Sequence, residues 1–159
     1  MKKLLAFFIT FIIIFFNGCS KEEKFGVEQF VDRCNTIYNT NYKTADFLLG
    51  KNKLEDNYLF YEKENTLLTL ILNKENQITG TSLLTTADNN IHEYINEFCR
   101  TASVITNSDY EVQKEILKQC GIDENSIKKT DSNWMITVGK YKYSVICNNY
   151  CITLFCERV

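Results

Sequence analysis

The chain alternates between two hydrophobic periods, one typical of helices and one typical of strands. Between residues 26 and 39, apolar side chains recur every three or four positions, which predicts an amphipathic helix with Cys34 in its buried stripe. The period then falls to two. Four strands are predicted in this region, at residues 44–49, 58–62, 66–73 and 77–85. The last two are joined by Asn73-Lys74-Glu75-Asn76, which favours a turn with Asn76 left-handed. We therefore expect a four-stranded antiparallel meander.

The helical period returns after this meander. Apolar positions predict a helix over residues 90–105, with Asn90 as its cap. A shorter helix should follow, because Ser108 and Glu111 have the spacing of a capping box. Gly121 is placed to end that helix in a left-handed conformation.

The last segment predicts strands joined by two tight turns. A two-residue turn at Gly139-Lys140 would pair Val138 with Tyr141 and Trp134 with Val145. A second turn at Asn148-Asn149 would pair Cys147 with Tyr150 and Val145 with Ile152. Residues 126–130 could add a fourth strand.

This register assigns each side chain to a face of the sheet. One face would be apolar and face the core, and it would hold Trp134, Ile136, Val138, Tyr141, Tyr143, Val145, Cys147, Ile152, Leu154 and Cys156. Cys151 would face away, so it should form no disulfide with Cys147. Met135, Ile146 and Phe155 would face away with it. That second face is either covered by other elements or is an exposed apolar patch for a partner.

The order of elements predicts an α+β fold. A helix and a four-stranded antiparallel meander would be followed by one or two helices and a second antiparallel meander, in a single compact domain over residues 26–159. The layout is loosely similar to the tandem helix-plus-sheet domains of beta-lactamase-inhibitor-type proteins. Layout does not by itself imply function.

The N-terminal residues have the pattern of an export signal. Lys2 and Lys3 precede an apolar run, Leu4 to Phe16, that is interrupted only by Thr10. As a helix, this run would measure roughly 20 Å, whereas the hydrocarbon core of a bilayer is about 30 Å thick. Its length is short for a membrane span and typical of a signal peptide.

The run ends in Phe16-Asn17-Gly18-Cys19, which resembles the lipobox of bacterial lipoproteins at Gly18 and Cys19. The resemblance implies that residues 1–18 are a signal peptide and that Cys19 carries diacylglycerol through a thioether. Two acyl chains suffice for stable anchoring. Residues 19–25 would then be the lipidated cysteine and a charged tether, and the protein would lie on the extracytoplasmic face of the cell membrane.

The charge balance argues against a nucleic-acid partner. Without the two signal lysines, 16 basic and 20 acidic residues remain, a net charge of −4. Binding to nucleic acid needs a basic surface.

Six cysteines remain besides Cys19: Cys34, Cys99, Cys120, Cys147, Cys151 and Cys156. In an exported chain they could form up to three disulfides, in fifteen possible pairings. They could equally be small buried apolar residues.

Candidate chemistry is sparse. His92 is the single histidine, and Asn96 stands where the zinc-protease pattern HExxH needs a second histidine. A Cys–His nucleophile pair of His92 with Cys99 or Cys34 is formally possible. Paired acids occur at Glu55-Asp56, Glu62 with Glu64, and Asp123-Glu124. We assign no catalytic residue, metal ligand or cofactor.

Three functions are therefore compared. The first is a membrane-anchored extracytoplasmic binding module for a protein, peptide or envelope component. The second is an inhibitor or immunity-type protein that blocks an envelope enzyme, with acids of the Lys51 to Asp56 loop entering its cleft. The third is a small envelope hydrolase that uses a cysteine or His92.

Overall fold

The computed structural model describes residues 25–51, 57–86, 91–123, 126–127, 133–148 and 150–159. The α-helices are α2 (Val27–Tyr38), α3 (Ile91–Thr106) and α4 (Tyr110–Gln119), with a short 3-10 helix η1 (Thr44–Asp46) after α2. The strands of the main sheet are β1 (Leu48–Lys51), β2 (Asn57–Lys63), β3 (Thr66–Leu72), β4 (Ile78–Thr86), β7 (Asn133–Val138), β8 (Tyr141–Cys147) and β9 (Cys151–Arg158). A separate two-stranded pair consists of β5 (Ile122–Asp123) and β6 (Ser126–Ile127).

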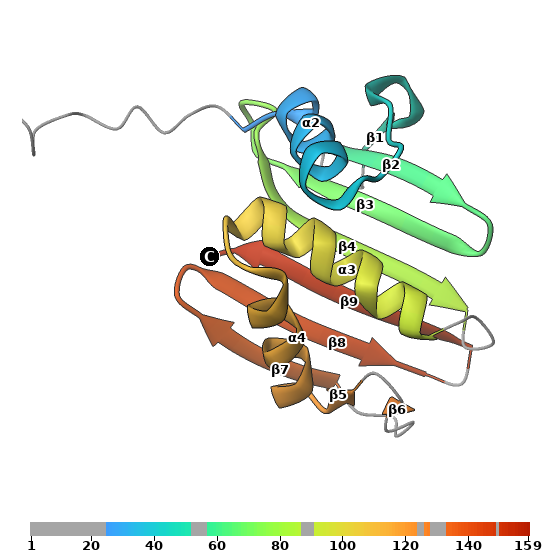
Figure 1. Ribbon diagram of the computed structural model, residues 1–159, viewed down its shortest axis with the longest axis vertical. Coiled ribbons are helices and arrows are strands. Elements are labelled where there is room, and N and C mark those ends of the chain that lie inside the picture. Colours follow the sequence, from blue (N-terminus) through green and yellow to red (C-terminus); the bar gives the residue numbers. More distant parts are fainter. Residues whose placement is uncertain (1–24, 52–56, 87–90, 124–125, 128–132, 149) are drawn as a thin grey trace, which may run out of the picture.

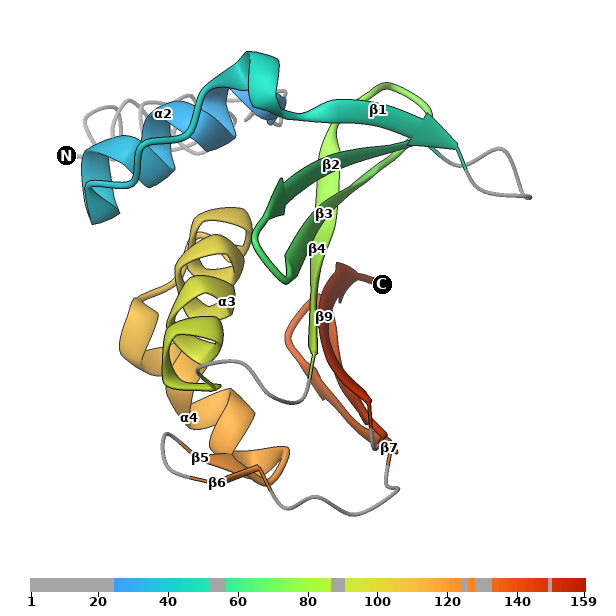
Figure 2. The same ribbon diagram turned by 90° about the vertical axis from the view of Figure 1, so that its right-hand side faces the viewer.

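The two meanders expected from the sequence join into one sheet. Its strand order is β1-β2-β3-β4-β9-β8-β7, and every neighbouring pair is antiparallel. The α+β class is thus confirmed, and the arrangement differs in detail from the expected one because both meanders belong to a single seven-stranded sheet. The helices α2, α3 and α4 all lie on the same side of this sheet (Figures 1 and 2).

The two halves meet where β4 pairs with β9. Leu83 lies opposite Leu154, and both side chains are fully buried beneath α3. At Gly80 the strands are so close that a Cβ atom would lie 2.6 Å from the Cys156 carbonyl oxygen. Only glycine has no side chain at this point, so Gly80 allows the close approach of the two strands.

The core lies between the sheet and α3. Phe30 of α2 and Phe98 of α3 are fully buried. The Tyr94 hydroxyl donates hydrogen bonds to the carbonyl oxygens of Leu83 and Ile152, and the Tyr141 hydroxyl donates to Ile105 O at 3.1 Å. These bonds fix both ends of α3 against the sheet.

The predicted β7–β8 register is confirmed. Val138 lies opposite Tyr141, and Trp134 lies opposite Val145. Gly139, the first turn residue, has the positive φ of 59° that the predicted turn requires.

The predicted β8–β9 register is wrong by two residues. Cys147 pairs with Ile152 rather than Tyr150, and Val145 pairs with Leu154 rather than Ile152. The cause is Asn148, whose side-chain oxygen accepts hydrogen bonds from the backbone N–H groups of Tyr150 and Cys151, each at 2.8 Å. Asn148 therefore precedes the turn. A shift of two keeps every side chain on its predicted face.

Other local predictions have mixed outcomes. Residues 44–46 form η1 instead of a strand, and residues 126–127 pair with β5 outside the main sheet. The N-cap position of α4 is Asp109, whose side chain makes no capping hydrogen bond, and not Ser108, whose hydroxyl instead accepts a hydrogen bond from Gln113. The left-handed conformations of Asn76 and Gly121 are confirmed. Residues 128–130 and the proposed cap Asn90 lie outside the described residues.

The six cysteines after Cys19 are all free thiols. Five are buried, and only Cys151 is partly exposed. The expectation that Cys147 and Cys151 are not bonded to each other is confirmed. Burial raises the pKa of both the Cys34 and the Cys156 thiol to about 12, so these groups remain protonated at neutral pH.

We expect alkylation of the native protein to modify Cys151 and to leave the five buried thiols unmodified. Burial blocks the reagent, and the reactive thiolate is scarce where the pKa is raised. Iodoacetamide labelling followed by peptide mass spectrometry measures this. Denaturation without reduction should then expose all six thiols. A smaller number would mean that the protein contains disulfides.

Within the part of the chain that the structure describes, no helix is both long and apolar enough to cross a bilayer.

Candidate functional site

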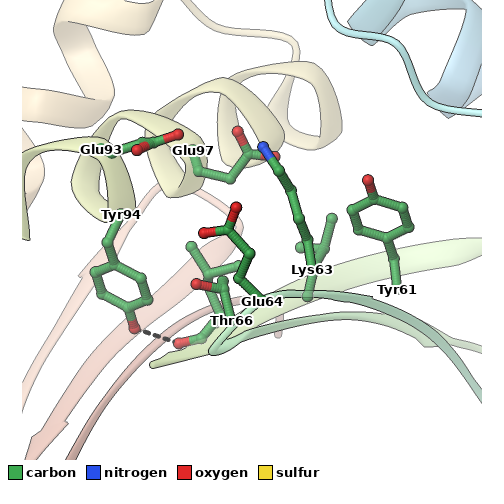
Figure 3. Close-up of a pocket in the computed structure, with 9 residues that line it drawn as sticks. Tyr61, Lys63, Glu64, Thr66, Glu93, Tyr94 and Glu97 are labelled. Carbon is green, nitrogen blue, oxygen red and sulfur yellow. Dashed lines mark hydrogen bonds between the residues drawn. The ribbon is translucent and has the colours of Figure 1, made fainter. Parts of the chain in front are cut away.

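A small pocket opens between the β2–β3 hairpin and α3 (Figure 3). Its volume is about 90 Å³. Its wall combines one ammonium, three carboxylates, two tyrosines and apolar side chains, from Tyr61, Lys63, Glu64, Thr66, Leu68, Leu83, Glu93, Tyr94 and Glu97. The pocket is therefore acidic on balance, and its floor is the buried sheet.

The hairpin turn directs two charged residues to this pocket. Lys63 pairs with Thr66, so Glu64 and Asn65 make the turn. Glu64 has a φ of 54°, a left-handed conformation that costs a non-glycine residue on the order of 1 kcal/mol. In Figure 3 the side chains of Lys63 and Glu64 rise from the turn toward the acids of α3.

Helix α3 supplies the other two acids. Glu93 and Glu97 are one turn apart, so both side chains lie on the same face of the helix. Burial raises the pKa of Glu97, and Arg100, whose Nη1 lies 3.9 Å from Glu97 Oε2, partly opposes the shift. The charged form of the Glu97 carboxylate therefore lowers the stability of the fold. A carboxylate in such a pocket suits the binding of a cationic group such as an amine or guanidinium.

We expect Glu97→Gln to increase the free energy of unfolding at pH 7. The folded-state pKa of Glu97 is raised, so the folded protein favours the protonated form, and that stability is lost as the pH rises through the folded pKa. The neutral amide removes this loss. The gain should vanish below about pH 4, where the carboxyl is also protonated in the unfolded chain. Urea unfolding at several pH values measures the effect.

Glu115→Gln is the matched control, since Glu115 is exposed on α4. Its stability should change by less than about 0.5 kcal/mol at any of these pH values. A destabilised Glu97→Gln protein at pH 7 would show that the carboxylate makes a stabilising contact instead.

The sheet face opposite the helices is a second candidate surface. Here we call it the outer face, and Figure 2 shows no described helix on that side. Met135 and Leu48 are 65% and 67% exposed on it, and Ile146 and Leu84 are also exposed. The sequence predicted that Met135, Ile146, Phe155 and Cys151 face away from the core. The structure confirms this and leaves their face uncovered by other described elements.

One row across the outer face carries no charge. Strand pairing aligns it over all seven strands as Met135, Ser144, Phe155, Ser82, Thr69, Phe60 and Leu48. Among the described residues of this face, charged side chains occur only toward the ends of the strands, as Glu62 at one end and Lys142 beside Glu157 at the other. An apolar and hydroxyl-rich centre with a charged margin is typical of a protein interface.

The structure does not bring the sequence-derived catalytic candidates together. His92 is exposed and its Nδ1 lies 3.0 Å from the Asn96 amide nitrogen. Cys99 and Cys34 are fully buried. Among the described residues, no three His, Cys, Asp or Glu side chains converge as a metal site would require. Cys19, Glu55 and Asp56 lie outside the described residues.

Sequence reasoning grouped Glu64 with Glu62, but the structure separates them. Glu62 lies on the outer face, while Glu64 lines the pocket with Glu93 and Glu97. The four-residue spacing of Glu93 and Glu97 was a signal in the sequence. Their proximity to Glu64 depends on how α3 packs against the hairpin, which no local pattern contains.

No protein-family model matches this chain, and no curated protein or solved structure matches it either.

Proposed function

We propose that this protein is a membrane-anchored extracytoplasmic lipoprotein whose domain binds a partner protein through the outer face. The N-terminal sequence supports the anchor at Cys19, and the uncharged row across the outer face carries the binding proposal. At about 4.8 Å per strand, the seven-stranded row measures roughly 29 Å. That matches the width of a standard protein interface, which buries about 800 Å² per partner.

The composition of the outer face favours a protein over a small ligand. Small ligands bind in concave pockets that surround them, whereas this surface is an extended strand array. Its largest side chains are methionine and aromatic residues, which are enriched in the centres of protein interfaces: Met135, Phe155, Phe60 and Tyr58.

A photo-crosslinking residue at Met135 tests this proposal in the intact envelope. The matched control carries the same residue at Val112, which is 46% exposed on α4. We expect one defined adduct from position 135 and none from position 112. An adduct with a second copy of the chain would instead identify the outer face as a self-association surface, and equal labelling at both positions would contradict the proposal.

A second variant moves the photo-crosslinking residue to position 146 so that Met135 can be changed. In this protein we expect Met135→Lys to reduce the yield of the partner adduct at least tenfold. A lysine here would be buried without a partner, which costs several kcal/mol of binding free energy. Because Met135 is exposed in the free protein, the melting temperature should hardly change. Turnover of ester, glycoside or peptide substrates by the purified protein would favour the hydrolase alternative.

The inhibitor alternative has a separate test. Replacement of Glu55 and Asp56 by alanine should abolish binding if the Lys51 to Asp56 loop enters the cleft of an envelope enzyme. If the outer face is the binding surface, the crosslink from position 135 persists in that variant.

A further inference from the structure

The strand β7 forms one edge of the seven-stranded sheet (Figure 1). It pairs with β8 along one side, and none of the described strands pairs with its other side. Proteins usually protect such an edge with a charged residue, a proline or a bulge. β7 contains neither a charged residue nor a proline, and its pairing with β8 is unbroken over all six residues. The opposite edge strand, β1, has only four residues and ends in Lys51.

The pairing of β7 with β8 shows which of its backbone groups point to the open side. A two-residue turn closes with a hydrogen-bonded pair, which here is Val138 and Tyr141. The Val159 N–H donates to the Lys140 carbonyl oxygen at 2.9 Å, so Lys140 points toward β9 and the next residue points toward β7, as this pair requires. Hydrogen-bonded and open positions then alternate along β7. The N–H and C=O groups on the open side belong to Asn133, Met135 and Thr137.

A hollow of about 570 Å³ lies along this open edge. Four consecutive residues of β7 line it, although alternate side chains of a strand point to opposite faces of a sheet. A hollow that both kinds of side chain reach lies beside the edge and not over one face. Its other wall is the end of α4. None of its described lining residues is charged: Gln119, Cys120, Gly121, Asn133, Trp134, Met135 and Ile136.

We infer that an extended segment of the partner protein pairs with β7 as an eighth strand and directs alternate uncharged side chains into this hollow. The inference rests on the proposed function, because the added strand would continue the outer face beyond Met135. Strand addition gives the open N–H and C=O groups of β7 their partners, and a lining pocket selects alternate side chains. β7 has six residues and measures about 20 Å, so a segment of about six residues matches it.

A second copy of β7 does not suit the hollow. Its Trp134 packs on Gly121 of its own chain, so closely that a Cβ atom on Gly121 would overlap the indole ring. Its Ile136 is half-buried and packs against the core of its own domain. These are the side chains that β7 directs to the helix side of the sheet, so a second β7 has none to place in the hollow. A segment of a different protein has them free.

A photo-crosslinking residue at Gln119 of the complete lipoprotein tests the inference in the intact envelope. Gln119 is exposed at the end of α4, on the helix side of the sheet, and lines the hollow. We expect an adduct with the same partner as from position 135. Mass spectrometry of the crosslinked peptides should place both crosslinks in one partner segment of about six residues. Position 112, on the same helix, remains the control and should give no adduct.

Thr137→Pro removes one open N–H group and no hydrogen bond to β8. With the crosslinker at position 119, we expect this variant to reduce the adduct at least fivefold, because a carbonyl group of the added strand loses its donor. Thr137→Ala is the matched control, since it keeps the N–H, and its yield should equal that of the wild type. The melting temperature should stay near the wild-type value in both, because an edge strand tolerates proline where its N–H faces solvent.

Three outcomes would overturn the inference and leave the proposed function intact. In the first, position 135 gives the partner adduct and position 119 gives none, as expected if the partner lies flat on the outer face. In the second, the two Thr137 variants give equal yields. In the third, position 119 reacts with a second copy of the chain. If Thr137→Pro fails to fold, the comparison of positions 119 and 135 still decides. If position 135 gives no adduct, the proposed function itself is wrong and the inference fails with it.

Discussion

Replacement of Cys19 by serine should remove all acyl mass from the protein. The thioether of a lipoprotein forms on a thiol, and Cys19 is the residue that matches the lipobox. Each buried CH₂ of an acyl chain contributes about 0.8 kcal/mol, so the loss of two chains lowers membrane partitioning by many orders of magnitude. The measurement is the intact mass of protein extracted from membranes, before and after reduction and alkylation.

The wild-type mass should equal residues 19–159 plus acyl chains. Cys151→Ser is the matched control and should keep the acyl mass, because Cys151 is a partly exposed thiol of the folded domain. A wild-type chain that still carries residues 1–18 without acyl groups would contradict the anchor. It would also return Cys19 to the pool of free thiols.

Phe98→Ala should destabilise the domain by about 3–5 kcal/mol. Phe98 is fully buried at the centre of α3, where the helix packs on the joined sheet, and truncation leaves a cavity beneath it. Such a loss is a large share of the 5–15 kcal/mol that is usual for a whole domain. The midpoint of thermal unfolding should fall by roughly 10 °C or more.

Ile37→Ala is the control for this prediction. Ile37 is 60% exposed on α2, so its truncation should cost less than about 0.5 kcal/mol. Circular dichroism of both variants during heating and in urea provides the comparison. Equal effects of the two substitutions would mean that α3 does not pack on the sheet as described.

Local sequence signals predicted the backbone conformation correctly where it depends on the side chains of a single segment. Asn76, Gly121 and Gly139 adopt the positive φ angles that their turn and cap positions predicted. Prediction failed where two local signals competed. At Asn148 the side-chain oxygen accepts hydrogen bonds from the following N–H groups, and the β8–β9 register is thereby shifted by two residues.

The candidate surfaces were predictable to different degrees. Alternation along β7, β8 and β9 was enough to place Met135, Ile146 and Phe155 on the outer face. The acidic pocket was not foreseen. It combines residues from elements that are distant in the sequence, as Glu64 with Glu97.

The sequence by itself determined most of the helical and strand segments and the faces of the last three strands, because these depend on residues close together in the chain. The tertiary structure decided that β4 pairs with β9. This pairing in turn decided every contact between the first and the second meander. Leu83 and Leu154 are about 70 residues apart, and the free energy of their contact depends on long-range packing that no local pattern records.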